Sequence, residues 1–358
     1  MNKLKQSIIN PTLVFLVMLM LAVMKIGCAN FNKLYTLQPA KLYVANEDGG
    51  SVSVIDLQNS RKNTIIDLTD SQGEMYMAHN VQTAPDGKSV WVTAVPMDSS
   101  KAEQLVVIGS DTGTIKKRIQ LGKHLHVAHV VLDNESKNAF VTTKDSSQVF
   151  QVNAATYEVV RRFDLGKDNA PHGMRYFNGK LYVASMGSKS LSIVNVADGQ
   201  IRDIPLQGMA VQTGVTQDGK FVFVSLYDTK EVARYDLLRG QITKIPLPEG
   251  SQGPIQLYAT PDSKLLYVCD QGELLQRPVS DKVYVIDISY AKVINTIKVG
   301  NKAHGVVVSR DGKAAYVTNT SDNTISIIDV ITQKVTGTVP VGKGPNGISY
   351  WFATGGMP

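Results

Sequence analysis

Apolar positions recur along the chain in short runs with an alternating pattern. From Leu42 onward, an aromatic residue followed by Val stands at the centre of a short apolar run, and a second alternating run follows each of these centres. Aromatic and β-branched residues in runs of this length favour strands that are buried on one or both faces. The centres lie 41 to 49 residues apart, and they are Tyr43, Trp91, Phe140, Tyr182, Phe223, Tyr267 and Tyr316.

Tight turns separate many of these runs. The segments PDGK at 85–88, QDGK at 217–220 and RDGK at 310–313 each precede an aromatic centre. Asp-Gly between apolar runs indicates a hairpin, since Gly supplies the positive φ that the turn needs. Each repeat therefore predicts about four short antiparallel strands, which form one blade of a propeller. The predicted fold class is all-β, a seven-bladed β-propeller.

The first repeat lacks an innermost strand. The segment GPNGISYW at 344–351 follows the seventh repeat and matches innermost strands such as AHGVVV at 303–308. We expect it to complete blade one and to close the ring, which removes exposed sheet edges. The predicted propeller domain covers residues 41–358.

The repeat motifs resemble a known family. YVTN at 316–319, PHG at 171–173, AHG at 303–305 and the segments SRDGK and TISIIDV are similar to those of the YVTN-repeat β-propeller family. The resemblance implies a fold similar to the haem d1 domain of cytochrome cd1 nitrite reductase and to lactonase-type propellers. It implies little about function, because propellers carry many unrelated activities.

The N-terminal segment predicts export. Lys3 and Lys5 precede an apolar run at 13–24, which is short for a membrane span. KIGC at 25–28 resembles a lipoprotein lipobox, although Lys25 replaces the usual Leu. We expect a signal peptide over 1–27, lipidation of Cys28 and a tether over 28–40. Ordinary cleavage and an uncleaved anchor are the alternatives.

This segment also sets the expected location. The prediction is an exported lipoprotein that faces the periplasm or the cell surface. Ala29 follows the lipidated position where an Asp would resemble an inner-membrane retention signal, so the outer membrane is favoured.

Charge and cysteine content exclude other classes. The net charge is +6, and residues 1–27 contribute three lysines and no acid, so the remainder carries +3. This excess is too small to indicate a nucleic-acid partner. If Cys28 is lipidated, Cys269 has no disulfide partner, and its apolar context in LLYVC predicts a buried thiol.

Four of the six histidines occupy one place in the repeat. Each begins an innermost strand, and amides stand at the equivalent place in the other three blades. The innermost strands begin at the mouth of the central channel, on the face that also carries the long loops at 69–78, 96–102 and 270–281. The predicted channel-mouth set is His79, His129, His172, His304, Gln212, Gln256 and Asn346.

Two interpretations of this set remain open. Imidazole nitrogens suit copper, zinc or haem iron, so the four histidines are candidate metal or cofactor ligands. The alternative is structural, with each His bonded to loop backbone between blades, and no carboxylate or Cys at fixed spacing supports a metal site. His124 and His126 are expected to be exposed loop residues that do not share a metal with His129.

No other catalytic signature occurs. GxSxG, HExxH, CxxC and CxxCH are absent, so covalent haem is not expected and we lean against an enzyme. The repeated Asp56, Asp287 and Asp329 are expected to be structural. We predict a monomeric binding scaffold that holds a protein partner or a small ligand on its top face and reaches the membrane through its lipid. The alternatives are a haem d1-, copper- or zinc-binding propeller and a lactonase-like hydrolase.

Overall fold

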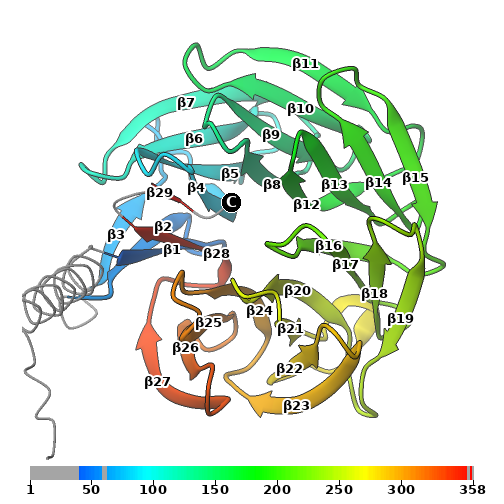
Figure 1. The fold of residues 1–358 in the computed structure, drawn as a ribbon. Coiled ribbons are helices and arrows are strands. Elements are labelled where there is room, and N and C mark those ends of the chain that lie inside the picture. Colours follow the sequence, from blue (N-terminus) through cyan, green and yellow to red (C-terminus); the bar gives the residue numbers. More distant parts are fainter. Residues whose placement is uncertain (1–39, 59–62, 353–354, 357–358) are drawn as a thin grey trace, which may run out of the picture. The chain divides into compact units, whose positions relative to one another are not determined.

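Seven antiparallel sheets surround a central channel (Figure 1). The computed structural model describes residues 40–58, 63–352 and 355–356. Each sheet is one blade, so the predicted all-β seven-bladed propeller is confirmed. The predicted signal peptide, Cys28 and most of the tether lie outside the described residues. Within those residues, no helix is long and apolar enough to cross a membrane.

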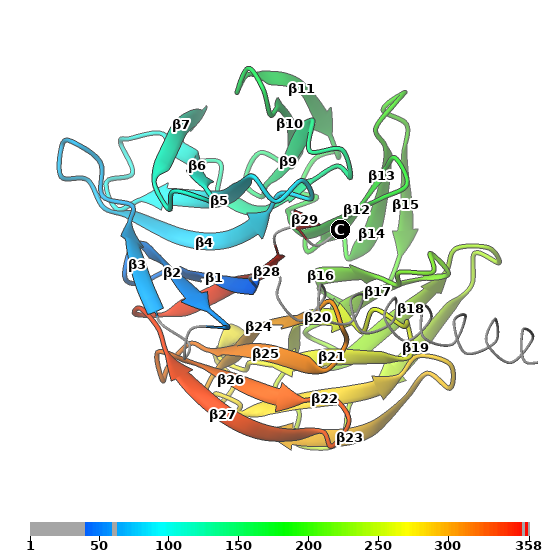
Figure 2. The same ribbon diagram turned by 60° about the vertical axis from the view of Figure 1, so that its left-hand side comes forward.

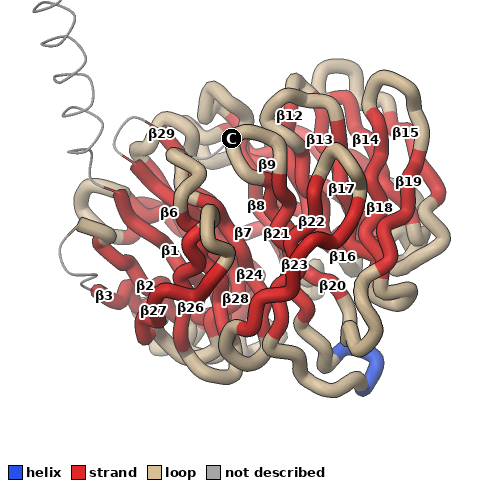
Figure 3. The backbone as a smooth tube through the Cα atoms, turned by 60° about the horizontal axis from the view of Figure 1, so that its bottom comes forward, coloured by secondary structure: helices blue, strands red, loops and turns tan. Residues whose placement is uncertain are grey.

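The blades are numbered from the one that holds the first described strand. Their strands, given from the channel outward, are as follows: blade 1, β28 (Pro345–Phe352), β1 (Ala40–Asn46), β2 (Ser51–Asp56), β3 (Asn63–Asp67); blade 2, β4 (Tyr76–Thr83), β5 (Ser89–Pro96), β6 (Glu103–Gly109), β7 (Ile115–Gly122); blade 3, β8 (Val127–Leu132), β9 (Asn138–Thr143), β10 (Gln148–Asn153), β11 (Val159–Asp164); blade 4, β12 (Pro171–Phe177), β13 (Lys180–Ser185), β14 (Ser190–Asn195), β15 (Ile201–Pro205); blade 5, β16 (Ala210–Val215), β17 (Phe221–Leu226), β18 (Glu231–Asp236), β19 (Ile242–Pro246); blade 6, β20 (Pro254–Ala259), β21 (Leu265–Asp270), β22 (Lys282–Asp287), β23 (Lys292–Lys298); blade 7, β24 (Ala303–Val308), β25 (Ala314–Asn319), β26 (Thr324–Asp329), β27 (Lys334–Pro340). The two-residue strand β29 (Gly355–Gly356) pairs with β28, and a short 3-10 helix, η1 (Leu274–Gln276), lies in the loop between β21 and β22 (Figure 3).

The ring closes as the sequence predicted. β28 pairs antiparallel with β1, with Tyr43 opposite Ser349, and it contacts β4 and β24, the innermost strands of the two neighbouring blades (Figure 2). Across the joint with blade 2, the Trp351 indole Nε1 donates to the Gly87 carbonyl at 2.7 Å. The Thr83 hydroxyl donates to the Tyr350 carbonyl at 3.1 Å. The last strand is therefore tied to both neighbours of the joint.

The hydrophobic core lies between blades. One cluster joins Tyr43 and Val52 of blade 1 to Val81, Val92 and other apolar residues of blade 2, and comparable clusters fill the other junctions. Each blade buries its apolar faces only against its neighbours. The blades therefore depend on one another for stability.

The repeated aspartates shape turns. Asp287 accepts a hydrogen bond from the Tyr290 N–H at 2.9 Å, and Asp329 accepts one from the Thr332 N–H at 2.7 Å. Asp56 accepts one from the Gln58 N–H at 2.8 Å. These contacts confirm the structural role expected for them.

Closure gives a first testable outcome. Trp351 is 8% exposed and packs in the core between blades 1 and 2. We expect Trp351→Ala to lower the free energy of unfolding by about 3–5 kcal/mol, since a large aromatic is lost from a packed core. Urea unfolding followed by tyrosine fluorescence measures this.

Leu238→Ala is the matched control, because Leu238 is 90% exposed. It should unfold at the wild-type urea concentration. If Trp351→Ala did the same, the joint between β28 and blade 2 would not support the ring.

Candidate metal centre

In every blade, the pairing between the innermost strand and the second strand is interrupted at the same position. One extra residue is inserted there, so that a β-bulge forms. The breaks fall between Ala78 and Asn80, Val127 and Val130, Pro171 and Met174, Ala210 and Thr213, Pro254 and Leu257, Ala303 and Val306, and Pro345 and Ile348. All seven channel-mouth residues predicted from the sequence lie inside these bulges.

Hydroxyl groups of the adjacent strand support the bulges. The Thr142 hydroxyl accepts from the His129 N–H at 2.9 Å and donates to the His172 carbonyl of the next blade at 2.7 Å. Thr93, Ser225 and Thr318 make the same kind of bridge in blades 2, 5 and 7. The Ser or Thr that follows the aromatic-Val pair therefore links neighbouring blades beside the channel.

Cys269 occupies this position in blade 6. Its Sγ lies 3.9 Å from the Gly305 carbonyl, a long and weak counterpart of the hydroxyl bridge. The thiol is fully buried, and burial raises its pKa well above the usual range. A thiol that keeps its proton is a poor nucleophile, in agreement with the inert role expected for it.

Three of the four predicted histidines meet at one point. The side chains of His79, His129 and His172 each offer a nitrogen, and these atoms lie within 4.8 Å of one another. The ring centroids of His129 and His172 are 5.0 Å apart, and that of His79 lies 5.6 Å from His172 and 6.0 Å from His129. The rings come from β4, β8 and β12, so three consecutive blades supply them.

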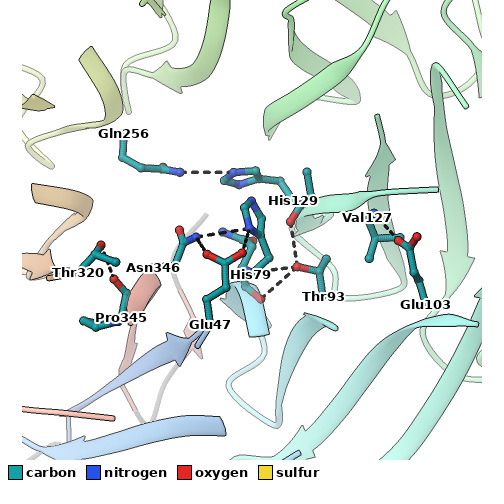
Figure 4. Close-up of polar contacts among 12 residues, drawn as sticks. Glu47, His79, Thr93, Glu103, Val127, His129, Gln256, Thr320, Pro345 and Asn346 are labelled. Carbon is teal, nitrogen blue, oxygen red and sulfur yellow. Dashed lines mark hydrogen bonds and ion pairs between the residues drawn. The ribbon is translucent and has the colours of Figure 1, made fainter. Parts of the chain in front are cut away.

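Two of the rings have a fixed tautomer. His79 Nδ1 lies 2.8 Å from a Glu47 carboxylate oxygen (Figure 4), and His172 Nδ1 lies 3.0 Å from the Val211 carbonyl. Both partners are acceptors, so each Nδ1 carries a proton, and in the neutral form of each ring the Nε2 atom has a free lone pair. The Nε2 of His79 is buried and has no hydrogen-bond partner among the described residues.

The Glu47 carboxylate is held in its charged form. Burial acts to raise its pKa, but the charge of His79 and hydrogen bonds from His79 and Asn346 outweigh burial and lower the pKa to about 2. The Asn346 amide donates to the second carboxylate oxygen. Glu47 therefore orients His79 from behind, as carboxylates commonly do behind metal-binding histidines.

His129 is held between two amides. The Thr213 N–H donates to the Gln212 carbonyl oxygen at 2.8 Å, and the Gln212 amide nitrogen donates to the Gln256 carbonyl oxygen at 2.6 Å. These hydrogen bonds turn the Gln256 amide nitrogen toward His129 Nε2, at 3.3 Å (Figure 4). The Gln212 amide nitrogen lies 3.4 Å from His129 Nδ1. A neutral imidazole has one lone pair, so it accepts from only one of the two amides.

Burial keeps His129 and His172 neutral. It lowers the pKa of His129 well below the usual range and lowers the pKa of His172 to about 3. Burial likewise lowers the pKa of His304 to about 3. Neutral imidazole is the form that binds metal ions.

His304 is close to the cluster but is not part of it. It is near enough to influence the pKa values of Glu47, His129 and His172, and its Nε2 is buried without a partner among the described residues. Its nitrogen lies outside the mutually close set. The predicted four-histidine set thus becomes a group of three with a fourth ring beside it.

The loop before β8 carries His124 and His126. Both residues have positive φ, at 55° and 51°, and both are exposed, as expected. The Glu103 carboxylate, 5% exposed, accepts from the N–H groups of Leu125, His126 and Val127 at 2.8, 3.0 and 2.7 Å. This anchor holds the His126 ring 6.4 Å from that of His79, closer to the cluster than its loop position suggested.

Glu47, which was not among the predicted residues, reaches the channel mouth from the turn between β1 and β2. One expectation requires correction. The first long loop was expected to end at Ala78, but β4 begins at Tyr76, because Tyr76 already pairs with Pro96. No sequence signal marks Glu47, since its contact with His79 is made across the blade boundary.

Comparisons with known proteins give the fold. No family model matches the chain. A stretch of 127 residues is 30% identical to the uncharacterized protein YncE of Salmonella typhi, covering 35% of this chain and 32% of that protein. The chain spans about a third or less of the length of the curated relatives it matches.

Solved structures align over most of the chain. Virginiamycin B lyase from Staphylococcus aureus aligns with a TM-score of 0.64 and 17% identity, covering 77% of this chain and 92% of that one. Apo AztD from Citrobacter koseri aligns with a TM-score of 0.64 and 14% identity, covering 90% and 99%. These similarities support the β-propeller fold.

The hydroxyl bridge gives a second testable outcome. Thr142→Val should lower the free energy of unfolding by about 1–3 kcal/mol, because the His129 N–H and the His172 carbonyl stay buried and lose their partner. Chemical denaturation measures the change. Thr156→Val, at an exposed turn position, is the control and should leave stability unchanged; equal midpoints for the two variants would contradict the role of the bridge.

Proposed function

We propose that this protein binds one transition-metal ion, of the zinc or copper class, at the mouth of its channel. His79, His129 and His172 are the ligands. The convergence of their three nitrogens within 4.8 Å is the observation that carries the proposal. The fixed tautomers of His79 and His172, which leave both Nε2 lone pairs available, support it.

The geometry favours a bare ion. Zinc binds imidazole nitrogen at 2.0–2.1 Å, which places tetrahedral ligands about 3.3 Å apart. Changes in side-chain torsion that move each ring nitrogen by less than about 1 Å would bring the three nitrogens to that separation. A macrocycle such as haem d1 would have to separate rings whose centroids are only 5.0 to 6.0 Å apart, so we favour an ion over the haem alternative.

Three protein ligands leave a fourth coordination position. Water, a donor from a partner, or His304 after a change of rotamer can occupy it. The nearest carboxylate, Glu47, is already committed to His79 and Asn346. Reversible metal binding is therefore better supported than hydrolysis of a lactone.

The expected cellular setting is part of the proposal. We place the propeller outside the cytoplasm, lipid-anchored at Cys28, on the strength of the N-terminal sequence. Membership of the YVTN-repeat family rests on the repeat motifs.

A binding scaffold is the second candidate function. The loop that contains η1 exposes Leu274, Leu275 and Val279, while Arg277 fixes its base by donating to the Tyr227 and Asp228 carbonyls, both at 2.8 Å. A fixed loop with exposed apolar side chains suits a protein partner.

Metal titration tests the main proposal. Isothermal titration of metal-free protein with Zn²⁺ should give one site per chain. His79→Ala, His129→Ala and His172→Ala should each weaken binding by more than about 100-fold, beyond the 10–100-fold loss typical of a partner behind the ligands. His124→Ala, on the exposed side of the loop, is the control and should bind as wild type.

Stability gives an independent readout. At a free Zn²⁺ concentration of about 100 times Kd, the wild type should gain about 2.7 kcal/mol, and the three alanine variants should gain little. The site would be rejected if the wild type bound neither Zn²⁺ nor Cu²⁺ to saturation. It would also be rejected if all three alanine variants bound the metal as tightly as the wild type.

Glu47 has a distinct expected effect. Glu47→Gln keeps the shape of the side chain but removes the charge that fixes the Nδ1 proton on His79. We expect zinc affinity to fall by about 10–100-fold with the stoichiometry unchanged. Glu249→Gln, at an exposed loop position, is the control; an unchanged affinity in Glu47→Gln would show that Glu47 does not act through His79.

A further inference from the structure

A cationic side chain projects into the channel beyond the histidines. Arg175 lies on β12, three residues after His172. It lines a small cavity, open in part to solvent, together with Gln82, Gln256 and Tyr258. Arg175 and Tyr258 also line a second small cavity between blades 4, 5 and 6. The guanidinium therefore stands where the two cavities adjoin.

The charge of Arg175 has no acidic partner. Among the described residues, no carboxylate forms an ion pair with it. The guanidinium carbon lies 5.9 Å from the centroid of the Tyr258 ring. A charge removed from bulk water without a counter-charge is costly, and the cost falls when an anion is bound.

Most of its donors are available. A guanidinium has five N–H groups, and the hydrogen bond made by Arg175 goes to the Met174 carbonyl at 2.9 Å. The planar arrangement of the others matches two oxygens of one oxyanion. Burial lowers the pKa of Arg175 and raises the pKa of Tyr258 to about 12, so the phenol is a donor at neutral pH.

The surrounding groups are polar and neutral. Gln256 and Tyr258 come from β20 and Asn80 and Gln82 from β4, and the remaining wall is apolar side chain and glycine backbone. Within the described residues, no acidic side chain lines either cavity. A cavity with one cation, amide and phenol groups and no carboxylate would repel metal ions and accept anions.

We propose that Arg175 is the centre of a second binding site, which takes a small oxyanion, a carboxylate or a phosphate, inside the channel. Arg175 binds two of its oxygens, and Tyr258 and Gln256 are the flanking polar groups. The site shares no proposed ligand with the histidine cluster. The two proposals therefore rest on different ligands, and either can be rejected without the other.

Anion titration of the metal-free full chain tests the site. Acetate, oxalate and inorganic phosphate are compared at constant ionic strength set with chloride, after any chelator has been removed by gel filtration, because chelators are themselves carboxylates. We expect one anion per chain and a rise of Tm with anion concentration. Stronger binding of acetate or oxalate would identify the ligand as a carboxylate, and stronger binding of inorganic phosphate would identify it as a phosphate.

Arg175→Met separates a binding role from a structural one. It should weaken anion binding at least ten-fold and abolish the anion-dependent rise of Tm, while its Tm without anion should equal or exceed that of the wild type. Arg234→Met is the matched control, because Arg234 also stacks on a ring, that of Phe221 at 4.7 Å, but lies outside both cavities. It should keep wild-type anion affinity.

Arg175→Lys carries the test if Arg175→Met fails to fold. A point charge replaces the planar fork, so affinity should fall several-fold. The proposal is overturned if none of the three anions binds with a stoichiometry of one, or if the Arg175 variant that folds binds as tightly as the wild type. His79→Ala should retain anion binding, so loss of the metal site alone leaves this result unchanged.

Discussion

The bulge in each innermost strand is the constraint on which the channel depends. A regular strand alternates its side chains, so successive residues of an innermost strand would point to opposite faces of the blade. In each blade one inserted residue interrupts this alternation at the position of the predicted His, Gln or Asn. The hydroxyl on the second strand accepts a hydrogen bond from a buried N–H of the bulge. In four blades the same hydroxyl also donates to a carbonyl of the next blade and so links the two blades.

Electrostatics follow from this packing. Blades packed this closely exclude water from the channel mouth, which keeps His129 and His172 neutral, while Glu47 keeps its charge through its contacts with His79 and Asn346. A positive ion placed among the rings would gain the lone pairs of His129 and His172 without displacing protons from them. The same exclusion of water leaves Arg175 as a cation with few partners. Ring closure, which places Asn346 beside Glu47, is thus also a condition for the site.

The fold could be read from the sequence because each repeat carries the same local signals. Aromatic-Val pairs and Asp-Gly turns mark strands and hairpins along the repeats. The last strand has no partner in its own repeat, and only blade 1 lacks an innermost strand. The equivalent positions of His79, His129 and His172 in the repeat placed them at one height. Their convergence could not be read, because it depends on rotamers and on the order of blades around the ring. Glu47 and Arg175 carry no repeat signal at all: one acts across a blade boundary, and the other is an ordinary polar position in a strand until the channel encloses it.

The two candidate sites are connected through one side chain and through charge. Gln256 contacts His129 and also lines the cavity of Arg175, and the charge of Arg175 acts on His129. A dication at the histidines and the guanidinium repel each other across a short path of low dielectric constant. An oxyanion on Arg175 removes much of that repulsion, so each ligand should favour the other, and by linkage the two effects must be equal. A channel that holds a cation above an anion would then be more stable than one that holds either alone, because the ring brings both charges to its centre with few other groups to neutralise them.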